Sequence, residues 1–226
     1  MRIRVLSLAF LAALPTLALT QTALFEAPKP LVWPRQLALS PDGSQLAFVY
    51  RGDIWVCSSN GGRAIPLTNH VEMDSRPVWS PDGKVIAFAS NRNGNNDIYA
   101  IPAEGGTSRR LTWHTGSEVP QDWTPDGEIL FSGRRDSGYS ALFGMKVSSG
   151  AVRELLRDFV TVSQVRMLPG GEKVLYTRNG FPETRPRYEG SAASQLWTAN
   201  LSTGKRSPLH PNRFQHLNPA APSDGY

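Results

Sequence analysis

The chain has 226 residues, of which 40% are hydrophobic, with 24 Lys and Arg, 19 Asp and Glu, 4 His and one Cys. This length and apolar content are enough to bury a sizeable core, and a single cysteine excludes a scaffold stapled by internal disulfides. Setting aside Arg2 and Arg4 lowers the net charge from +5 to +3, and no Lys/Arg block is present, so no nucleic acid partner is expected.

Residues 1–20 have the pattern of a secretory signal peptide. Arg2 and Arg4 precede an apolar stretch that runs from Val5 to Ala18. The stretch is too short to span a bilayer, although an uncleaved anchor is an alternative. We therefore expect an exported protein, periplasmic or secreted, with residues 21–34 as a lead-in and no membrane span after removal of the signal.

The remainder of the chain repeats one skeleton four times. Each unit has a turn, an apolar run, an aliphatic–aromatic pair, a glycine and a leucine. The distance from the second residue of the pair to the glycine is always 7, from glycine to leucine 5, and from leucine to the next turn 14. The turns begin at Pro41, Pro81, Pro125 and Pro169, and the pairs are Ile54-Trp55, Ile98-Tyr99, Leu142-Phe143 and Leu196-Trp197.

Each unit contains four short stretches with strand character. In the second unit they are residues 77–79, 85–88, 97–101 and 109–112, separated by Gly, Pro, Asn and Asp. Four antiparallel strands at a period near 40–45 residues are typical of a β-propeller blade. The predicted fold is therefore all-β, a propeller of four-stranded antiparallel blades.

The spacing predicts four blades and the start of a fifth, at about residues 35–75, 76–119, 120–162, 163–216 and 217–226. The final step of 14 residues reaches Ser223-Asp224-Gly225, another turn sequence. Four blades that do not close would leave exposed strand edges. We therefore expect an incomplete ring, with further C-terminal blades in a longer parent protein.

All length variation between units falls between the turn and the aromatic pair, in the loop joining the second and third strands. This loop is short at Tyr50–Asp53 and longest at about Asn179–Ser194. A tolerated insertion at one fixed position is a surface loop, and such loops often bind ligands. Within it Phe181, Arg185, Arg187 and Tyr188 combine apolar surface with charge, so they are the candidate peptide-contact residues. The alternative is a solvated loop without function.

A search for catalytic and metal-binding patterns gives a negative expectation. The turn aspartates Asp42, Asp82, Asp126 and Asp224 occupy one repeat position, so they are interpreted as turn residues. His70, His114 and His210 follow or flank the repeat leucine and are interpreted as turn or cap residues. The segment 91–97 faintly resembles a calcium loop but lacks its glycine and closing glutamate, so an Asn-Gly hairpin is favoured. No catalytic residue, cofactor or metal is predicted.

The repeat resembles the TolB-type Pro-Asp propeller repeat, and longer runs are similar to the N-terminal propeller of bacterial tricorn-type serine peptidases. These runs are Arg51-Gly52-Asp53-Ile54-Trp55, Ala89-Ser90-Asn91-Arg92, Arg110-Leu111-Thr112-Trp113-His114 and Asp122-Trp123-Thr124-Pro125-Asp126-Gly127. The resemblance extends from about Trp33 to the end of the chain.

The resemblance implies a non-catalytic propeller that guides or docks peptide or protein ligands for a peptidase core, whose catalytic serine lies downstream of these residues. Two alternatives remain. One is a TolB-like protein-interaction propeller, although only about a dozen residues, 21–33, precede the first blade where TolB-like proteins carry a separate domain. The other is a propeller fused to a different secreted hydrolase, such as an amidohydrolase.

Overall fold

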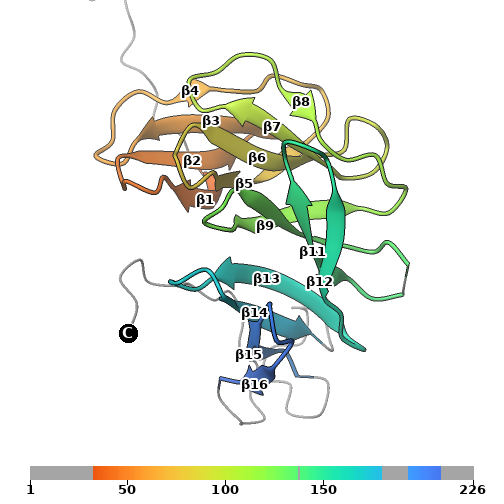
Figure 1. The fold of residues 1–226 in the computed structure, drawn as a ribbon. Helices are drawn as coiled ribbons and strands as arrows, with labels where there is room; N and C mark the ends of the chain where they lie inside the picture. Colours follow the sequence, from red (N-terminus) through yellow and green to blue (C-terminus); the bar gives the residue numbers. More distant parts are fainter. Residues whose placement is uncertain (1–32, 137, 180–192, 210–226) are drawn as a thin grey trace, which may run out of the picture. The chain divides into compact units, whose positions relative to one another are not determined.

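The computed structural model describes residues 33–136, 138–179 and 193–209, which belong to one compact unit of residues 33–226. Within these ranges the regular secondary structure consists of β-strands alone, and the strands form four antiparallel four-stranded sheets (Figure 1). The predicted all-β propeller with four blades is confirmed. The signal peptide predicted at 1–20 and the fifth blade predicted from 217 lie outside the described residues.

In each blade the strands lie side by side in chain order. The first blade consists of β1 (Arg35–Leu39), β2 (Gln45–Tyr50), β3 (Asp53–Ser58) and β4 (Ile65–Pro66), and the second of β5 (Asp74–Trp79), β6 (Val85–Ser90), β7 (Asp97–Pro102) and β8 (Arg109–Arg110). The third consists of β9 (Glu118–Trp123), β10 (Glu128–Gly133), β11 (Ala141–Lys146) and β12 (Val152–Leu156), and the fourth of β13 (Thr161–Met167), β14 (Lys173–Asn179), β15 (Gln195–Asn200) and β16 (Arg206–Pro208).

The turn between the first two strands of a blade has the chemistry that its sequence predicts. In the first blade Gly43 adopts φ 72° and its N–H donates to the Ser40 carbonyl at 2.9 Å. The Ser40 hydroxyl and the Ser44 N–H both donate to Asp42 Oδ1, at 2.6 and 3.1 Å. Glycine supplies the left-handed conformation and the carboxylate satisfies donors that the turn would otherwise leave free. The turn fixes the register of the hairpin.

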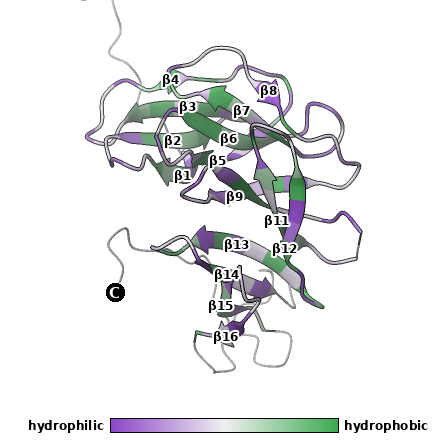
Figure 2. Cartoon of the chain, in the orientation of Figure 1, coloured by the Kyte–Doolittle hydropathy of each residue, from purple (hydrophilic) through white to green (hydrophobic). Residues whose placement is uncertain are grey.

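The hydrophobic core consists of three clusters, each between two neighbouring blades. The middle strands of the second blade contribute to two of them: Ile86 and Phe88 pack with the first blade, while Ala87 and Ile98 pack with the third. A sheet that is buried on both faces needs apolar residues at successive positions. This explains the predominantly hydrophobic colour of β6 and β7 in Figure 2.

Two tryptophans join neighbouring blades by hydrogen bonds. Trp79 Nε1 donates to the Ala38 carbonyl of the first blade at 3.0 Å, and Trp123 Nε1 donates to the Val78 carbonyl of the second at 3.3 Å. Both rings are buried in the clusters between blades, so each tryptophan is a packing residue as well as a hydrogen-bond donor. Met167 holds the corresponding position in the fourth blade.

The first strand of each blade is its innermost strand, and backbone hydrogen bonds at the starts of β5 and β9 also join neighbouring blades. The backbone N–H groups of Asp74 and Glu118 donate to the carbonyls of Gly52 and Asn96 in the preceding blade, both at 2.7 Å. Loops between second and third strands therefore contribute directly to the contact between blades. No helix among the described residues has the length and apolar character required to cross a bilayer.

Candidate ligand-binding cavity

The innermost strands β1, β5, β9 and β13 contact one another in chain order, from blade to blade. Each innermost strand also pairs with the second strand of its own blade, which is β2, β6, β10 or β14. All four of these pairings contain a register shift. A β-bulge places one extra residue in a strand and redirects its side chain. Much of β9 has hydrophilic colour in Figure 2, unlike the middle strands.

In three blades the bulge includes a non-glycine residue in the left-handed region, five positions before the turn proline. These residues are Gln36 (φ 52°), Arg76 (φ 54°) and Gln164 (φ 51°). The third blade has Pro120 at this position, and because the proline ring restricts φ to negative values the bulge there leaves Gln121 unmatched instead. Strained conformations of this kind persist where the surrounding structure holds them, and they are frequent at binding sites.

The bulges line a polar cavity of about 330 Å³ with residues from all four innermost strands. Its lining residues are Gln36, Leu37, Arg76, Pro77, Val78, Pro120, Gln121, Gln164 and Arg166. A larger cavity of about 660 Å³ shares Leu37, Pro77, Val78, Gln121 and Arg166 with it and extends to the turn prolines Pro41, Pro81 and Pro125, with Trp79 and Trp123 in its wall.

Hydrogen bonds hold several of the cavity's polar groups in place. Gln36 Oε1 accepts the Arg76 backbone N–H at 2.7 Å, which links the first two blades. Gln121 donates from Nε2 to Ser132 Oγ at 2.9 Å and accepts the Val165 N–H at 3.1 Å. Arg166 Nη1 donates to the Gln121 carbonyl at 2.6 Å. The cavity wall is therefore built from side chains with fixed positions.

Asp122 is the carboxylate among the lining residues of the larger cavity. Its Oδ2 accepts the Met167 N–H at 2.7 Å, which joins the third and fourth blades, and its Oδ1 accepts the Trp123 N–H at 2.9 Å. Burial raises the pKa of this carboxyl, while the two backbone donors and the charge of Arg166 act in the opposite direction. Both carboxylate oxygens accept hydrogen bonds from backbone N–H groups, so the role of Asp122 is to connect the third and fourth blades.

The first residues of β5 and β9 are buried acids, and each is paired with an arginine. Asp74 Oδ2 lies 2.6 Å from Arg92 Nη2, and Glu118 Oε1 lies 2.6 Å from Arg135 Nε, with both acidic side chains fully buried. Each guanidinium also lies over the aromatic pair of its own blade: Arg92 over Phe88 and Tyr99, and Arg135 over Phe131 and Phe143. The acid and the arginine of each pair thus neutralise each other within a single blade, and the arginine also contacts that blade's aromatic rings.

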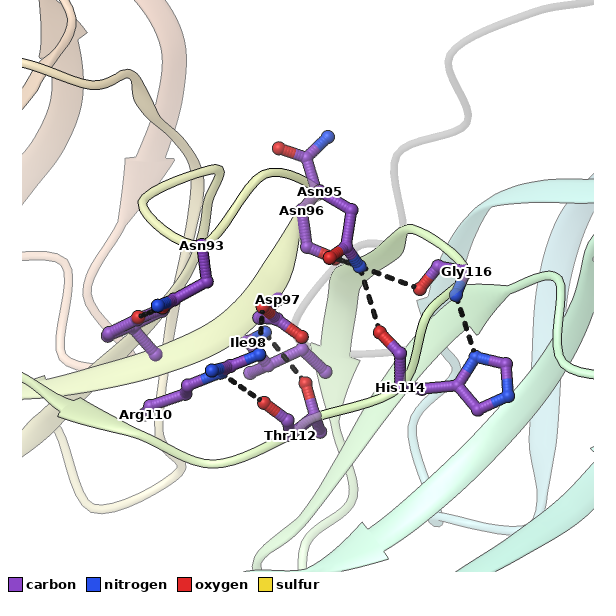
Figure 3. A network of polar contacts seen from close by, with 10 residues as sticks. Asn93, Asn95, Asn96, Asp97, Ile98, Arg110, Thr112, His114 and Gly116 are labelled. Carbon is purple, nitrogen blue, oxygen red and sulfur yellow. Dashed lines mark hydrogen bonds and ion pairs between the residues drawn. The ribbon is translucent and has the colours of Figure 1, made fainter.

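The asparagine-rich loop between β6 and β7 is part of a polar network between the second blade and the start of the third (Figure 3). Asn95 Nδ2 donates to the carbonyls of His114 and Gly116, at 2.9 and 3.1 Å. Asn93 Oδ1 accepts the Tyr99 hydroxyl at 2.6 Å. Two of the side chains that suggested a calcium loop, Asn93 and Asn95, are thus engaged with other protein groups. In the described ranges no three His, Cys, Asp or Glu side chains come together as metal ligands.

Asp97 belongs to the same network. Its Oδ2 lies 2.7 Å from Arg110 Nη2, and the following N–H, of Ile98, donates to Thr112 Oγ1 at 2.9 Å. Burial raises the pKa of the Asp97 carboxyl, although Arg110 opposes this shift. The first blade repeats the arrangement, because the Ile54 N–H donates to Thr68 Oγ1. The network is a repeated structural feature.

Two histidines make the same local contact in successive blades. His70 Nδ1 accepts the Glu72 N–H at 3.0 Å, and His114 Nδ1 accepts the Gly116 N–H at 2.9 Å. Each ring closes the segment between two blades, so their interpretation as turn or cap residues is confirmed. His210 lies outside the described residues.

The candidate peptide-contact residues Phe181, Arg185, Arg187 and Tyr188 also lie outside the described residues, so no described structure brings them together. The cavity at the bulges was not predicted from the sequence. One pattern could have indicated it: polar residues five positions before the turn proline in three of the four units. Their convergence requires knowledge of the blade order in space.

Comparisons with known proteins agree with this architecture. A family model described as the tricorn protease N-terminal beta propeller domain matches residues 35–224. The uncharacterized peptidase YuxL of Bacillus subtilis (strain 168) is 33% identical over 66 residues, which cover 25% of this chain and 10% of that protein. The chain thus matches only a small part of this relative.

Two solved structures have the same fold. A protein from Agrobacterium tumefaciens assigned as TolB superposes with a TM-score of 0.70 and 25% identity, over 84% of this chain and 70% of that chain. Tricorn protease superposes with a TM-score of 0.61 and 19% identity, over 81% of this chain and 19% of that chain. The second likeness concerns the fold alone.

Proposed function

This chain belongs to the tricorn protease N-terminal β-propeller family, and from that premise we propose that it is a non-catalytic module that docks or guides polypeptide ligands for an exported serine peptidase. The observation that carries the proposal is the pair of joined cavities along the innermost strands. An extended polypeptide presents backbone donors and acceptors as well as side chains, and a wall of amides, guanidinium groups and apolar rings offers partners for all of them.

A non-catalytic role is supported by how the chain uses its reactive groups. The Nδ1 atoms of His70 and His114 accept backbone N–H groups, and the buried acids Asp74 and Glu118 are paired with arginines. The proposed peptidase chemistry belongs to a further domain of a longer parent protein. Export rests on the signal pattern of residues 1–20, and the loop with Phe181, Arg185, Arg187 and Tyr188 remains a proposed additional contact.

A second candidate function is that of a TolB-like protein-interaction propeller. It is favoured by one observation: the TolB structure gives a higher TM-score and identity than tricorn protease does. Both candidates share ligand docking by the propeller and differ in whether a peptidase core is attached. The next domain of the parent protein would distinguish them.

The docking function can be tested by blocking the cavity. Leu37 lines both cavities and its side chain is 59% exposed, so Leu37→Trp should narrow the site without disturbing a packed core. We expect unstructured peptides of mixed sequence to bind the purified chain, and Leu37→Trp to weaken binding about tenfold or more, measured by fluorescence anisotropy. The same preparation should hydrolyse none of the peptides.

Ile65→Trp is the matched control. Ile65 has almost the same exposure, 58%, but lies on β4 and lines neither cavity. It should leave peptide affinity unchanged. If no peptide binds, or if the two tryptophan variants bind as the wild-type chain does, the cavity is not the docking site and the proposal fails.

A further inference from the structure

We propose that the joined cavities bind a carboxylate of an extended polypeptide, with Arg76 as the residue that selects for it. This inference rests on the proposed docking function and names the ligand chemistry of the same site. The carboxylate can belong to an Asp or Glu side chain or to a C-terminus, since both present the same two oxygens to a guanidinium group.

The charge of the smaller cavity favours an anion. Its described lining residues include two arginines, Arg76 and Arg166, and no aspartate or glutamate. The three glutamines in the wall add amide groups but no charge. Asp122 of the larger cavity interacts electrostatically with Arg166, so Arg76 is the arginine whose charge no described carboxylate offsets. An anionic ligand at Arg76 would supply the missing counter-charge.

The donors of Arg76 are available. Its backbone N–H is bound by Gln36, but no described residue accepts a hydrogen bond from its guanidinium group, and the residue is exposed. By contrast, Arg166 already donates from Nη1 to the carbonyls of Gln121 and Val165. A guanidinium group with all five donors free forms paired hydrogen bonds with a carboxylate. Arg76 is therefore the main anion-binding group, with Arg166 as a fixed second charge.

The larger cavity offers space for an apolar side chain next to the carboxylate. It shares Leu37 and Arg166 with the smaller cavity and is also lined by Trp79 and Trp123. Its carboxylate, Asp122, directs both oxygens to the backbone N–H groups of Met167 and Trp123. An extended segment with an acidic group and a neighbouring apolar residue fits both compartments. Two arginines without a longer basic stripe favour such a polypeptide over a nucleic acid.

The chain itself supplies a substitution that should preserve the backbone. Gln36 and Gln164 occupy the same bulge position as Arg76, with φ 52° and 51° against 54°. Glutamine is therefore compatible with this left-handed conformation in two blades. Arg76→Gln removes the charge and leaves the bulge intact, whereas a β-branched replacement would add strain.

The experiment compares four peptides that share one sequence and differ at two places: Glu against Gln inside the peptide, and a free C-terminus against an amide. Binding to the purified chain and to Arg76→Gln is measured by fluorescence anisotropy at low and at physiological ionic strength. The wild-type chain should bind the carboxylate-bearing peptides about tenfold more tightly than the fully neutral peptide. Arg76→Gln should abolish that difference and reduce the salt dependence.

Arg63→Gln is the control, because Arg63 is exposed between β3 and β4 and lines neither cavity; it should keep the preference. Comparing the peptide with internal Glu and the peptide with a free C-terminus shows which source of carboxylate is preferred. Equal binding of neutral and acidic peptides, or an unchanged preference in Arg76→Gln, would overturn the inference while leaving docking intact. Absence of binding by every peptide would refute the docking function itself.

Discussion

In the first three blades, the aspartate of the first turn is held as an anion by a hydroxyl two residues earlier, whereas the fourth blade has Gly170 at this position. The Ser40 hydroxyl, followed by the Ser44 hydroxyl and N–H, lowers the pKa of Asp42 to about 2. The pKa of Asp82 is lowered chiefly by the Ser80 hydroxyl, and that of Asp126 chiefly by the Thr124 hydroxyl. The sequence identified these acids as turn residues, and the structure adds that the hydroxyl is part of the motif.

At the residue scale we expect Ser40→Ala to raise the pKa of Asp42 toward 3.8, measured by NMR titration of the carboxyl. Because the folded-state pKa is depressed, the contribution of Asp42 to stability is present above pH 3.8 and is lost as the pH falls through about 2. The stability difference between wild type and Ser40→Ala should therefore shrink over the same interval. Ser148→Ala, at an exposed position, should leave the titration unchanged; an identical curve for Ser40→Ala would contradict this account.

At the scale of elements, blades are joined by groups that point out of one strand into the next sheet. Trp79 and Trp123 combine a buried ring with one hydrogen bond to a carbonyl of the preceding blade. In the fourth blade Met167 has no such donor in its side chain, and its backbone N–H bonds to Asp122 instead. A substitution at one position thus changes how two sheets are connected.

We expect Trp79→Phe and Trp123→Phe each to lower the free energy of unfolding by about 1–3 kcal/mol, because a half-buried carbonyl loses its donor and some packed surface is lost. Urea denaturation measures this. Trp113→Phe is the matched control: its ring is 68% exposed, and the change should stay within about 0.5 kcal/mol. Equally small changes in unfolding free energy for all three variants would show that the tryptophan hydrogen bonds between blades do not contribute to stability.

At the scale of the whole described unit, stability is unevenly distributed. The second and third blades contribute to two clusters each, and β10 is buried at every position. By contrast, β1 has four exposed residues of five, and β16 is exposed throughout. In repeat architectures each unit is stabilised by its neighbours, so the number of packed faces determines local stability.

Hydrogen exchange followed by mass spectrometry should therefore show the slowest exchange in β6, β7, β10 and β11. The amides of β1 and β16 should exchange much faster, because fewer packed side chains must separate for them to open. Digestion fragments that contain the second- and third-blade strands serve as the internal reference. Uniform protection across all four blades would instead indicate a unit that opens only by global unfolding.

The blade framework could be predicted because it is a local, repeated pattern. In the second unit the predicted strands 85–88 and 97–101 correspond to β6 (Val85–Ser90) and β7 (Asp97–Pro102). The prediction for the innermost strand, 77–79, was too short, since β5 begins at Asp74. Asp, Ser and Arg have no strand pattern of their own, and the strand extends there because the Asp74 N–H bonds to Gly52 in the preceding blade.

The all-β class, the four blades and the turn chemistry can be predicted from the sequence alone, since they depend on spacings of a few residues and on local backbone preferences. The place where Gln36, Arg76, Gln121 and Gln164 meet depends on how the blades pack in three dimensions. These residues are about 40 positions apart, and each is one polar residue in a short strand. They line one cavity because the blades pack in chain order and the bulges redirect their side chains, and neither effect is contained in the pattern of a single repeat.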